Sequence, residues 1–267
     1  MEQEFLNQNH PEENKKKSTG YTFSTAGIVA LAAASCDKDN TLRYNNFTMG
    51  NIVDGKFVSD QGNTFNVVEQ TCPGRLDTLE RAVVLCDVLY QEEGGDYAVR
   101  LNNFQKVLAK SPINSSENTD ESILTNDALI LSDLWISGGY INMSLTLPVK
   151  IENNQPHTIN LMFDDTDQTE GTYKFTLLHN ANGEVLKSDS SNNDMYLANA
   201  YVSFPITSII TEESATIRLT WKSYKLNNQY MVSSETVGQT YDIKYVKGAF
   251  EQVPAAKSGE VSTFSLR

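Results

Sequence analysis

The side chains best suited to catalysis or metal binding are few in this sequence: three histidines and three cysteines among 267 residues. His10 lies in a polar leader, which leaves His157 and His179 as candidates for metal binding or general base catalysis. A zinc site takes three or four ligands, and a catalytic histidine needs a third group to position it. His157 begins one predicted strand and His179 ends another, so the two could meet at one rim of a sheet. We interpret them as hydrogen-bonding residues at strand ends, with a hydrolytic pair as the alternative.

An acidic segment, DDTDQTEG, offers oxygen ligands between two predicted strands. Its carboxylates are those of Asp164, Asp165, Asp167 and Glu170. Carboxylates at such spacing can bind Ca²⁺, but the segment lacks the glycine and the spacing of an EF-hand loop. We therefore expect a solvated loop, with calcium as a weaker alternative, and predict no metal site and no cofactor.

The sequence contains none of the short motifs that announce common catalytic sites. There is no Gly-x-Ser-x-Gly elbow, no Walker loop, no His-Glu-x-x-His helix and no pair of Cys-x-x-Cys sequences. Glycosidases that use two carboxylates leave little sequence trace, so a secreted hydrolase stays an alternative. The sequence predicts no catalytic residues.

The cysteine at position 36 ends a short apolar stretch near the start of the chain. Lys15–Lys17 form a basic cluster, and the apolar run 26–34 is far shorter than the about 20 residues that span a bilayer. A basic region, a short apolar region and small residues before a cleavage point are typical of a secretory signal peptide. Residues 33–35 before Cys36 resemble a bacterial lipobox, although the leucine at position 31 is two residues early and the leader is long. We predict a signal peptide over 1–35, acylation of Cys36 and a tether over 36–43; cleavage elsewhere, or a buried helix with an incidental cysteine, is the alternative.

Two cysteines and one threonine follow in the mature chain. In an oxidising compartment Cys72 and Cys86 could form a disulfide that closes a loop of roughly 15 residues. Cys86 also lies in the apolar run RAVVLCDVLY, where a free thiol behaves as a small hydrophobe, and both readings stay open. Thr78 in the triplet DTL matches a short acceptor pattern for O-glycosylation in Bacteroidetes.

The charge of the chain, −13, weighs against nucleic acid as a partner. The basic residues between positions 44 and 110 are dispersed, whereas a nucleic-acid surface needs a basic, aromatic-rich face. A saccharide could stack on Tyr90, Tyr97 or Phe104, all of which could equally be core residues. The expected partners are the membrane, through the lipid anchor, and an unknown protein or saccharide.

Hydrophobic residues alternate with period two along most of the mature chain, which predicts an all-β protein. Five short runs, with a hairpin turn at Asp54-Gly55, predict an OB-like barrel over 44–110. A polar segment, 111–126, is the predicted linker. The runs over 127–250 predict a β-sandwich, followed by a tail over 251–267. Within this region we expect a turn at Asn182-Gly183 that leads into a short strand over 184–187.

Several phrases of the sequence resemble the NigD-like lipoprotein family of Bacteroidales. They are AAASC, MGNIVDGKFVSDQGNTF, RAVVLCDVL, DLWISGGYINMSLTL, HTINLMF, LLHNANGE and AYVSFPI, and the resemblance covers most of residues 44–246. It implies an OB-like domain followed by a β-sandwich on a lipid anchor, and it supplies no catalytic residues. The family name links it to bacteriocin gene clusters, which suggests immunity or envelope roles.

The resulting hypothesis is a non-enzymatic lipoprotein of the outer membrane, facing the periplasm or the cell surface, that acts as a binding module. A bacteriocin-immunity or envelope-protection factor and a secreted hydrolase are the alternatives.

Overall fold

A computed structural model describes residues 42–117, 120–152, 155–167, 169–188, 192–226, 232–248, 251–253 and 262–263, with side chains described from residue 48 to residue 248. Apart from one turn of 3-10 helix, η1 (Leu76–Thr78), the regular elements of these residues are strands. The all-β class is therefore confirmed. The predicted signal peptide, Cys36 and most of the tether lie outside the described residues. Within the described part of the chain, no helix has the length and apolarity to cross a membrane.

The first module is built from five strands whose pairings close a ring. They are β1 (Leu42–Val53), β2 (Lys56–Ser59), β3 (Thr64–Gln70), β4 (Arg81–Gln91) and β5 (Tyr97–Ala109). β1 pairs with β2, β2 with β3, β3 in parallel with β5, β5 with β4, and β4 with β1. Asp54 and Gly55 both have positive φ, as the predicted hairpin turn requires. Alternate residues of the five strands, including Phe57, Phe65 and Leu101, fill the interior of the ring.

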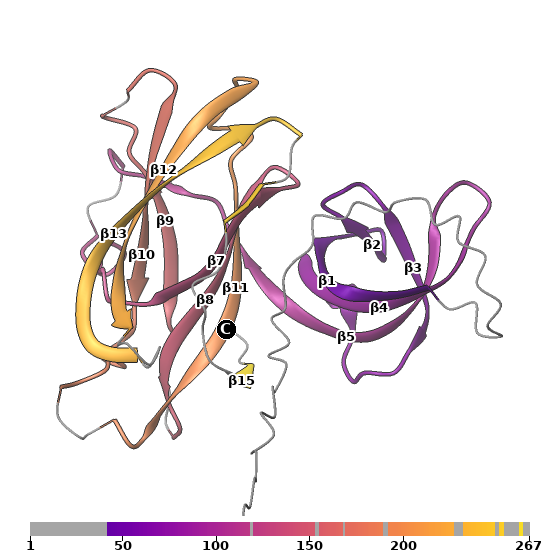
Figure 1. Cartoon of the computed structure of the whole chain (residues 1–267), viewed down its shortest axis with the longest axis horizontal. Helices are drawn as coiled ribbons and strands as arrows, with labels where there is room; N and C mark the ends of the chain where they lie inside the picture. Colours follow the sequence, from indigo (N-terminus) through magenta and orange to yellow (C-terminus); the bar gives the residue numbers. More distant parts are fainter. Residues whose placement is uncertain are drawn as a thin grey trace, which may run out of the picture.

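The second module is a sandwich of two sheets (Figure 1). One layer contains β7 (Ile130–Ser137), β8 (Tyr140–Lys150), β11 (Met195–Pro205) and β14 (Glu251–Val253). The other contains β6 (Ile113–Asn114), β9 (Thr158–Phe163), β10 (Thr172–Asn180), β12 (Ser214–Leu226) and β13 (Val232–Val246). Apolar residues of both layers meet in one core that includes Met143, Phe175, Phe204 and Leu219. The predicted β-sandwich is confirmed.

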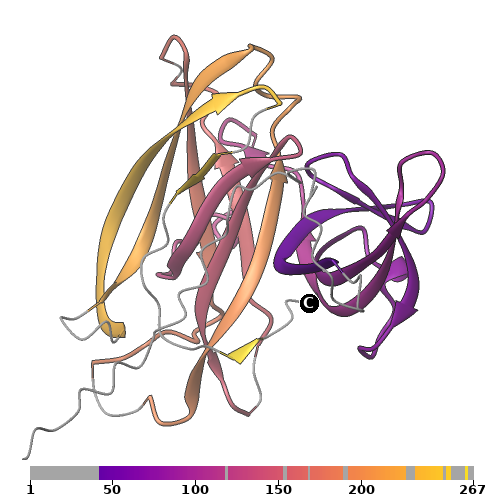
Figure 2. The same ribbon diagram turned by 45° about the vertical axis from the view of Figure 1, so that its right-hand side comes forward.

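The two modules share a strand. β5 pairs with the barrel along most of its length, and its last residues, Val107–Ala109, pair in parallel with Tyr201–Ser203 of β11. The barrel strands and one sandwich layer therefore belong to a single hydrogen-bonded sheet, and Figure 2 shows the barrel held against the edge of that layer. A two-residue strand, β15 (Ser262–Thr263), pairs in parallel with Ala198–Asn199 of β11, just before the stretch of β11 that pairs with β5.

Three details differ from the pattern of the sequence. The predicted linker 111–126 contains β6, which pairs with β9 in the sandwich. The predicted tail contains β14, which pairs with β7. The turn at Asn182-Gly183 is present, but residues 184–187 form no strand, because the amides of Leu186 and Lys187 donate to the side chains of Tyr224 and Asn192 instead of to a neighbouring strand.

Candidate functional site

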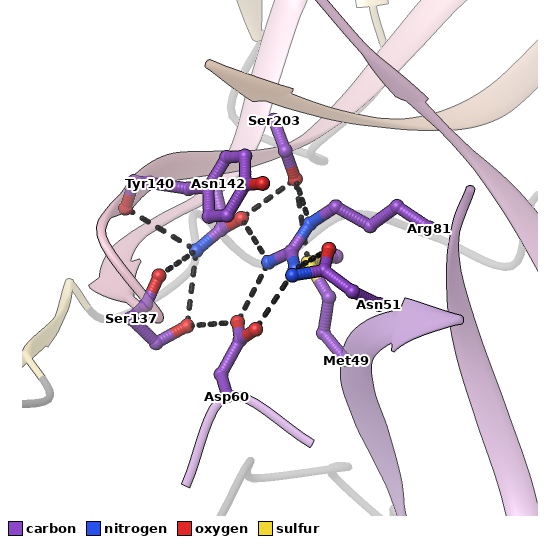
Figure 3. Close-up of polar contacts among 8 residues, drawn as sticks. All are labelled: Met49, Asn51, Asp60, Arg81, Ser137, Tyr140, Asn142 and Ser203. Atoms are coloured by element: carbon purple, nitrogen blue, oxygen red, sulfur yellow. Dashed lines mark hydrogen bonds and ion pairs between the residues drawn. The ribbon is translucent and has the colours of Figure 1, made fainter. Parts of the chain in front are cut away.

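The most extensive polar cluster of the described residues lies where the barrel meets the sandwich (Figure 3). Its centre is Arg81, the first residue of β4, whose side chain is only 1% exposed. A buried guanidinium is tolerated only when its charge is paired and its five N–H groups are bonded. Arg81 meets both conditions by using groups of both modules.

The barrel supplies the counter-charge of Arg81. Asp60, after β2, binds both terminal nitrogens of the guanidinium at 2.8 and 2.7 Å, and its side chain is 2% exposed. Asn51, directly opposite Arg81 on β1, accepts the second N–H of Nη1 at 2.9 Å. This two-pronged geometry is the strongest arrangement available to an arginine and a carboxylate.

The sandwich supplies the remaining acceptors. Ser203 of β11 accepts from Arg81 Nε at 2.9 Å, and Asn142 of β8 accepts from Nη2 at 3.0 Å. The ring of Tyr140 lies 4.1 Å from the guanidinium carbon, within range of a cation–π contact. All five N–H groups of Arg81 are thereby bonded.

A second set of contacts holds the partners of Arg81 in place. Ser137 Oγ donates to Asp60 Oδ2 at 2.5 Å, and Asn142 Nδ2 donates to Ser137 Oγ at 3.0 Å. The turn after β7 passes so close to Asp60 that a Cβ at Gly138 would lie 2.5 Å from Asp60 Oδ1. The cluster is a closed set of bonds between the modules, so its direct effect is to fix their relative position.

Sequence reasoning missed this cluster. A visible signal was the basic residue at the head of RAVVLCDVLY, since an arginine in an apolar strand needs a buried partner. The identity of that partner depends on pairing between distant segments, which the local pattern does not reveal.

A second buried cluster brings together the two histidines. His157 Nδ1 and His179 Nε2 are 2.9 Å apart, at the end of the β9–β10 pair. His179 Nδ1 lies 3.2 Å from the carbonyl of Ala128, so Nδ1 carries the proton and donates. His179 Nε2 is then the acceptor for His157 Nδ1–H. His157 Nε2 lies 3.4 Å from Glu184 Oε2.

Burial governs the protonation of this cluster. Burial, with repulsion from His157, lowers the pKa of His179 to about 4, and burial lowers the pKa of His157 against the opposing effect of Glu184. Burial alone would raise the pKa of Glu184, but hydrogen bonds from Lys150 and Gln155 outweigh it and leave that pKa lowered. The side chains of His157 and Glu184 are 2% and 1% exposed. The predicted meeting of the histidines is found, inside the protein and in hydrogen-bonding roles.

The cysteines of the barrel are both free thiols, so the disulfide alternative is not formed. Cys86 is buried in the barrel core, and burial raises the pKa of its thiol to about 12. Cys72 is partly buried against the same core, with Sγ 4.0 Å from the carbonyl oxygen of Leu101.

The remaining predicted residues lie at the surface or in the core. Thr78 is exposed at the end of η1, and its hydroxyl donates to the carbonyl of Arg75 at 2.8 Å. Of the three aromatic candidates for saccharide stacking, Tyr97 and Phe104 pack against the barrel core, whereas Tyr90 is 57% exposed. Tyr90 is therefore the most exposed of the three rings.

The acidic segment 164–170 is dispersed into separate contacts. Asp164 accepts from Thr166, Asp165 from Ser115 and Ser116, and Asp167 pairs with Lys174 at 2.6 Å. Among the described residues no group of three or more histidine, cysteine or acidic side chains is arranged to hold a metal ion. Glu170 is exposed.

Comparison with known proteins identifies the second module. The family described as NigD-like C-terminal beta sandwich domain matches residues 111–234. No curated protein matches the chain.

Solved structures share the fold of both modules. A protein of unknown function from Bacteroides vulgatus aligns with a TM-score of 0.55 and 20% identity, over 81% of this chain and 96% of that one. A NigD-like immunity protein from Bacteroides caccae aligns at 0.54 and 17%, over 80% and 100%. A candidate lipoprotein from Bacteroides fragilis aligns at 0.52 and 16%, over 76% and 97%. At these identities the likeness establishes the fold alone.

Replacing Arg81 should destabilise the protein strongly. In Arg81→Met the carboxylate of Asp60 stays buried without its cation, and we expect a loss of about 3–5 kcal/mol in the free energy of unfolding. Urea denaturation followed by intrinsic fluorescence measures this loss.

The control is Arg218→Met. Arg218 and Asp242 also form a two-pronged pair, through Nε and Nη2 at 2.7 Å for both bonds, but their side chains are 45% and 43% exposed. Removal of that arginine should cost less than about 1 kcal/mol. Equal losses in the two variants would contradict a special role for the buried pair.

Acid should weaken the fold through the histidine pair. The pKa of His179 is about 4 in the folded protein and about 6.5 in the unfolded chain, so between these values only the unfolded state binds the proton. The contribution of His179 to the free energy of unfolding is then complete above about pH 6.5. It falls by about 1.4 kcal/mol per pH unit as the pH drops toward 4. Urea denaturation at a series of pH values gives the slope. His179→Gln removes the titrating ring and should flatten the slope; an unchanged slope would assign the acid sensitivity to other groups.

Proposed function

We propose that this chain, which belongs with the NigD-like proteins through its C-terminal β-sandwich domain, is a cell-envelope lipoprotein that acts as a non-enzymatic binding module. In this proposal acylated Cys36 anchors the protein in the outer membrane, at the periplasmic face or the cell surface. The membrane is one partner, and an unknown protein or saccharide is the other.

The proposal rests on how the barrel is joined to the sandwich. Arg81 joins β4 to β8 and β11, and β5 belongs to both modules. A buried polar cluster and a shared strand therefore join the barrel to the sandwich. A rigid pair of modules can present a continuous surface to a partner without the entropic cost of ordering a hinge.

The anchor is supported by the sequence around Cys36 and by the likeness to a candidate lipoprotein. Several acyl chains on one cysteine hold a protein firmly to a bilayer, whereas one chain is marginal. The short span from Cys36 to β1 would keep the barrel near the membrane, since six extended residues reach roughly 20 Å.

Two surface features belong to the same proposal. Exposed Thr78 would carry an O-linked glycan, which mass spectrometry of the protein from its native host can detect. Exposed Tyr90 would be the stacking residue if the partner is a saccharide.

An immunity or envelope-protection role is the second candidate, favoured by the likeness to a NigD-like immunity protein. Deletion of the gene should then raise the sensitivity of the cells to at least one member of a panel of antibacterial proteins, and complementation should restore resistance. Unchanged sensitivity to the whole panel would remove this candidate and leave the binding role.

The anchor is tested by replacing its cysteine. We expect the protein expressed in a Bacteroides host to enter the detergent phase of Triton X-114, because its acyl chains partition with the detergent, and Cys36→Ala to stay in the aqueous phase. Cys72→Ala is the matched control and should behave as the wild type. Aqueous partitioning of the wild-type protein would contradict the lipid anchor.

A further inference from the structure

A hollow of about 430 Å³ lies on the sandwich beside the segment that leaves the barrel. The segment after β5, the end of β9 and the end of β11 border it. Its apolar walls come from Pro112, Phe163, Pro205 and Ile209, and Asp165 supplies a carboxylate. Ser111, Asn114 and Ser208 complete the lining, so the hollow combines apolar walls with neutral polar groups and one negative charge.

The charge of Asp165 is held in place by neutral groups. Oδ1 accepts from Ser115 Oγ at 2.8 Å and from the amide of Ser116 at 2.9 Å, and Oδ2 accepts from the Ser116 hydroxyl. These hydrogen bonds lower the pKa of Asp165 to about 2. Every donor to this carboxylate among the described residues is a hydroxyl or an amide, so its negative charge is oriented without being neutralised.

The other charges near the hollow are engaged with different partners. Asp167 is paired with Lys174. Lys110, just before the segment that borders the hollow, donates to Asn160 Oδ1 at 2.5 Å. Asp165 thus differs from its acidic neighbour in having no cationic partner within the described residues.

The aromatic wall of the hollow is fixed by packing. The ring of Phe163 is 5.2 Å from that of Phe175 and 6.1 Å from that of Tyr173, measured between centroids. Phe163 itself is half-buried, so part of its ring lines the hollow. A fixed aromatic surface beside a carboxylate suits a flat cation with an apolar stem.

We propose that this hollow binds an arginine side chain of a protein partner. Its guanidinium would pair with Asp165, and its stem would lie against Phe163 and the prolines. A bare metal ion is a poorer fit because the hollow offers one carboxylate, and an anion is repelled by it. The net charge of −13 would also steer a basic partner toward this protein.

This inference rests on the proposed binding role and names the chemistry of the partner. It requires no lipid anchor, so it can be tested on the full mature chain, residues 36–267, carrying Cys36→Ala. Failure of the anchor experiment and failure of the present one are therefore separate outcomes.

The test is a titration of the ¹⁵N-labelled chain with N-acetyl-arginine amide, followed by amide chemical shifts. We expect saturable shifts around Asn114, Ser116 and Ile209. N-acetyl-citrulline amide has nearly the same shape without the charge and should produce no saturable shifts. N-acetyl-lysine amide should bind more weakly than the arginine probe, because an ammonium is more strongly hydrated than a planar guanidinium and cannot lie flat against the ring of Phe163.

Three variants separate the hollow from general electrostatics. Asp165→Asn should weaken binding about tenfold, the loss expected for one charge-assisted bond. Asp167→Asn removes the same charge from the same loop and should change the dissociation constant less than about twofold, because exposed charges are screened. Ser208→Trp fills the hollow from an exposed position that also lines it and should block binding with Asp165 intact.

The proposal is overturned if the wild-type chain shows no saturable shifts, or if citrulline binds as well as arginine. It is also overturned if Asp165→Asn and Asp167→Asn weaken binding equally. A folded Ser208→Trp variant with unchanged affinity would place the probe elsewhere on the surface.

Discussion

The structure depends on one electrostatic constraint, the burial of the Arg81 guanidinium between two modules. A charge that leaves water must recover its lost hydration from fixed partners, and a partial set is worse than none. Asp60 and Asn51 provide part of the set, and Ser203 and Asn142 the rest. Because the set is complete only when both modules are in place, a hinge motion at this junction would expose or orphan several buried polar groups.

The backbone imposes the same geometry independently. β5 leaves the barrel and pairs with β11 at Ser203, which is also the acceptor for Arg81 Nε. The amide of Lys110 then donates to the carbonyl of Ser203 at 3.2 Å, so the chain enters the sandwich in a fixed position. The segment that borders the hollow begins at the next residue. The position of the hollow relative to the barrel therefore follows from the junction.

The features predicted correctly from the sequence are those encoded by neighbouring residues. Period-two alternation marks β9 and β10, and Asp54-Gly55 can adopt the positive φ of its hairpin turn. Features set by distant contacts were missed. Residues 184–187 form no strand because backbone amides of this segment donate to the side chains of Tyr224 and Asn192. Arg81 gave no sign that its sandwich partners lie on β8 and β11. The meeting of His157 and His179 was anticipated because they lie at the adjoining ends of two paired strands, but their burial depended on the packing of the whole sandwich.

Most of the buried polar groups described above have all their hydrogen-bonding positions filled by other groups of the protein, and their role is structural. A polar group with a position left over can bind a ligand. Around Arg81 each N–H finds an acceptor, and around His179 each ring nitrogen finds one partner. Such groups have no bonding capacity left for a ligand. Asp165 differs because a carboxylate has about four acceptor positions and a full charge, and its three donors are neutral. This carboxylate lies beside an aromatic wall and an open hollow. A cationic side chain in the hollow can therefore bond to its remaining acceptor position.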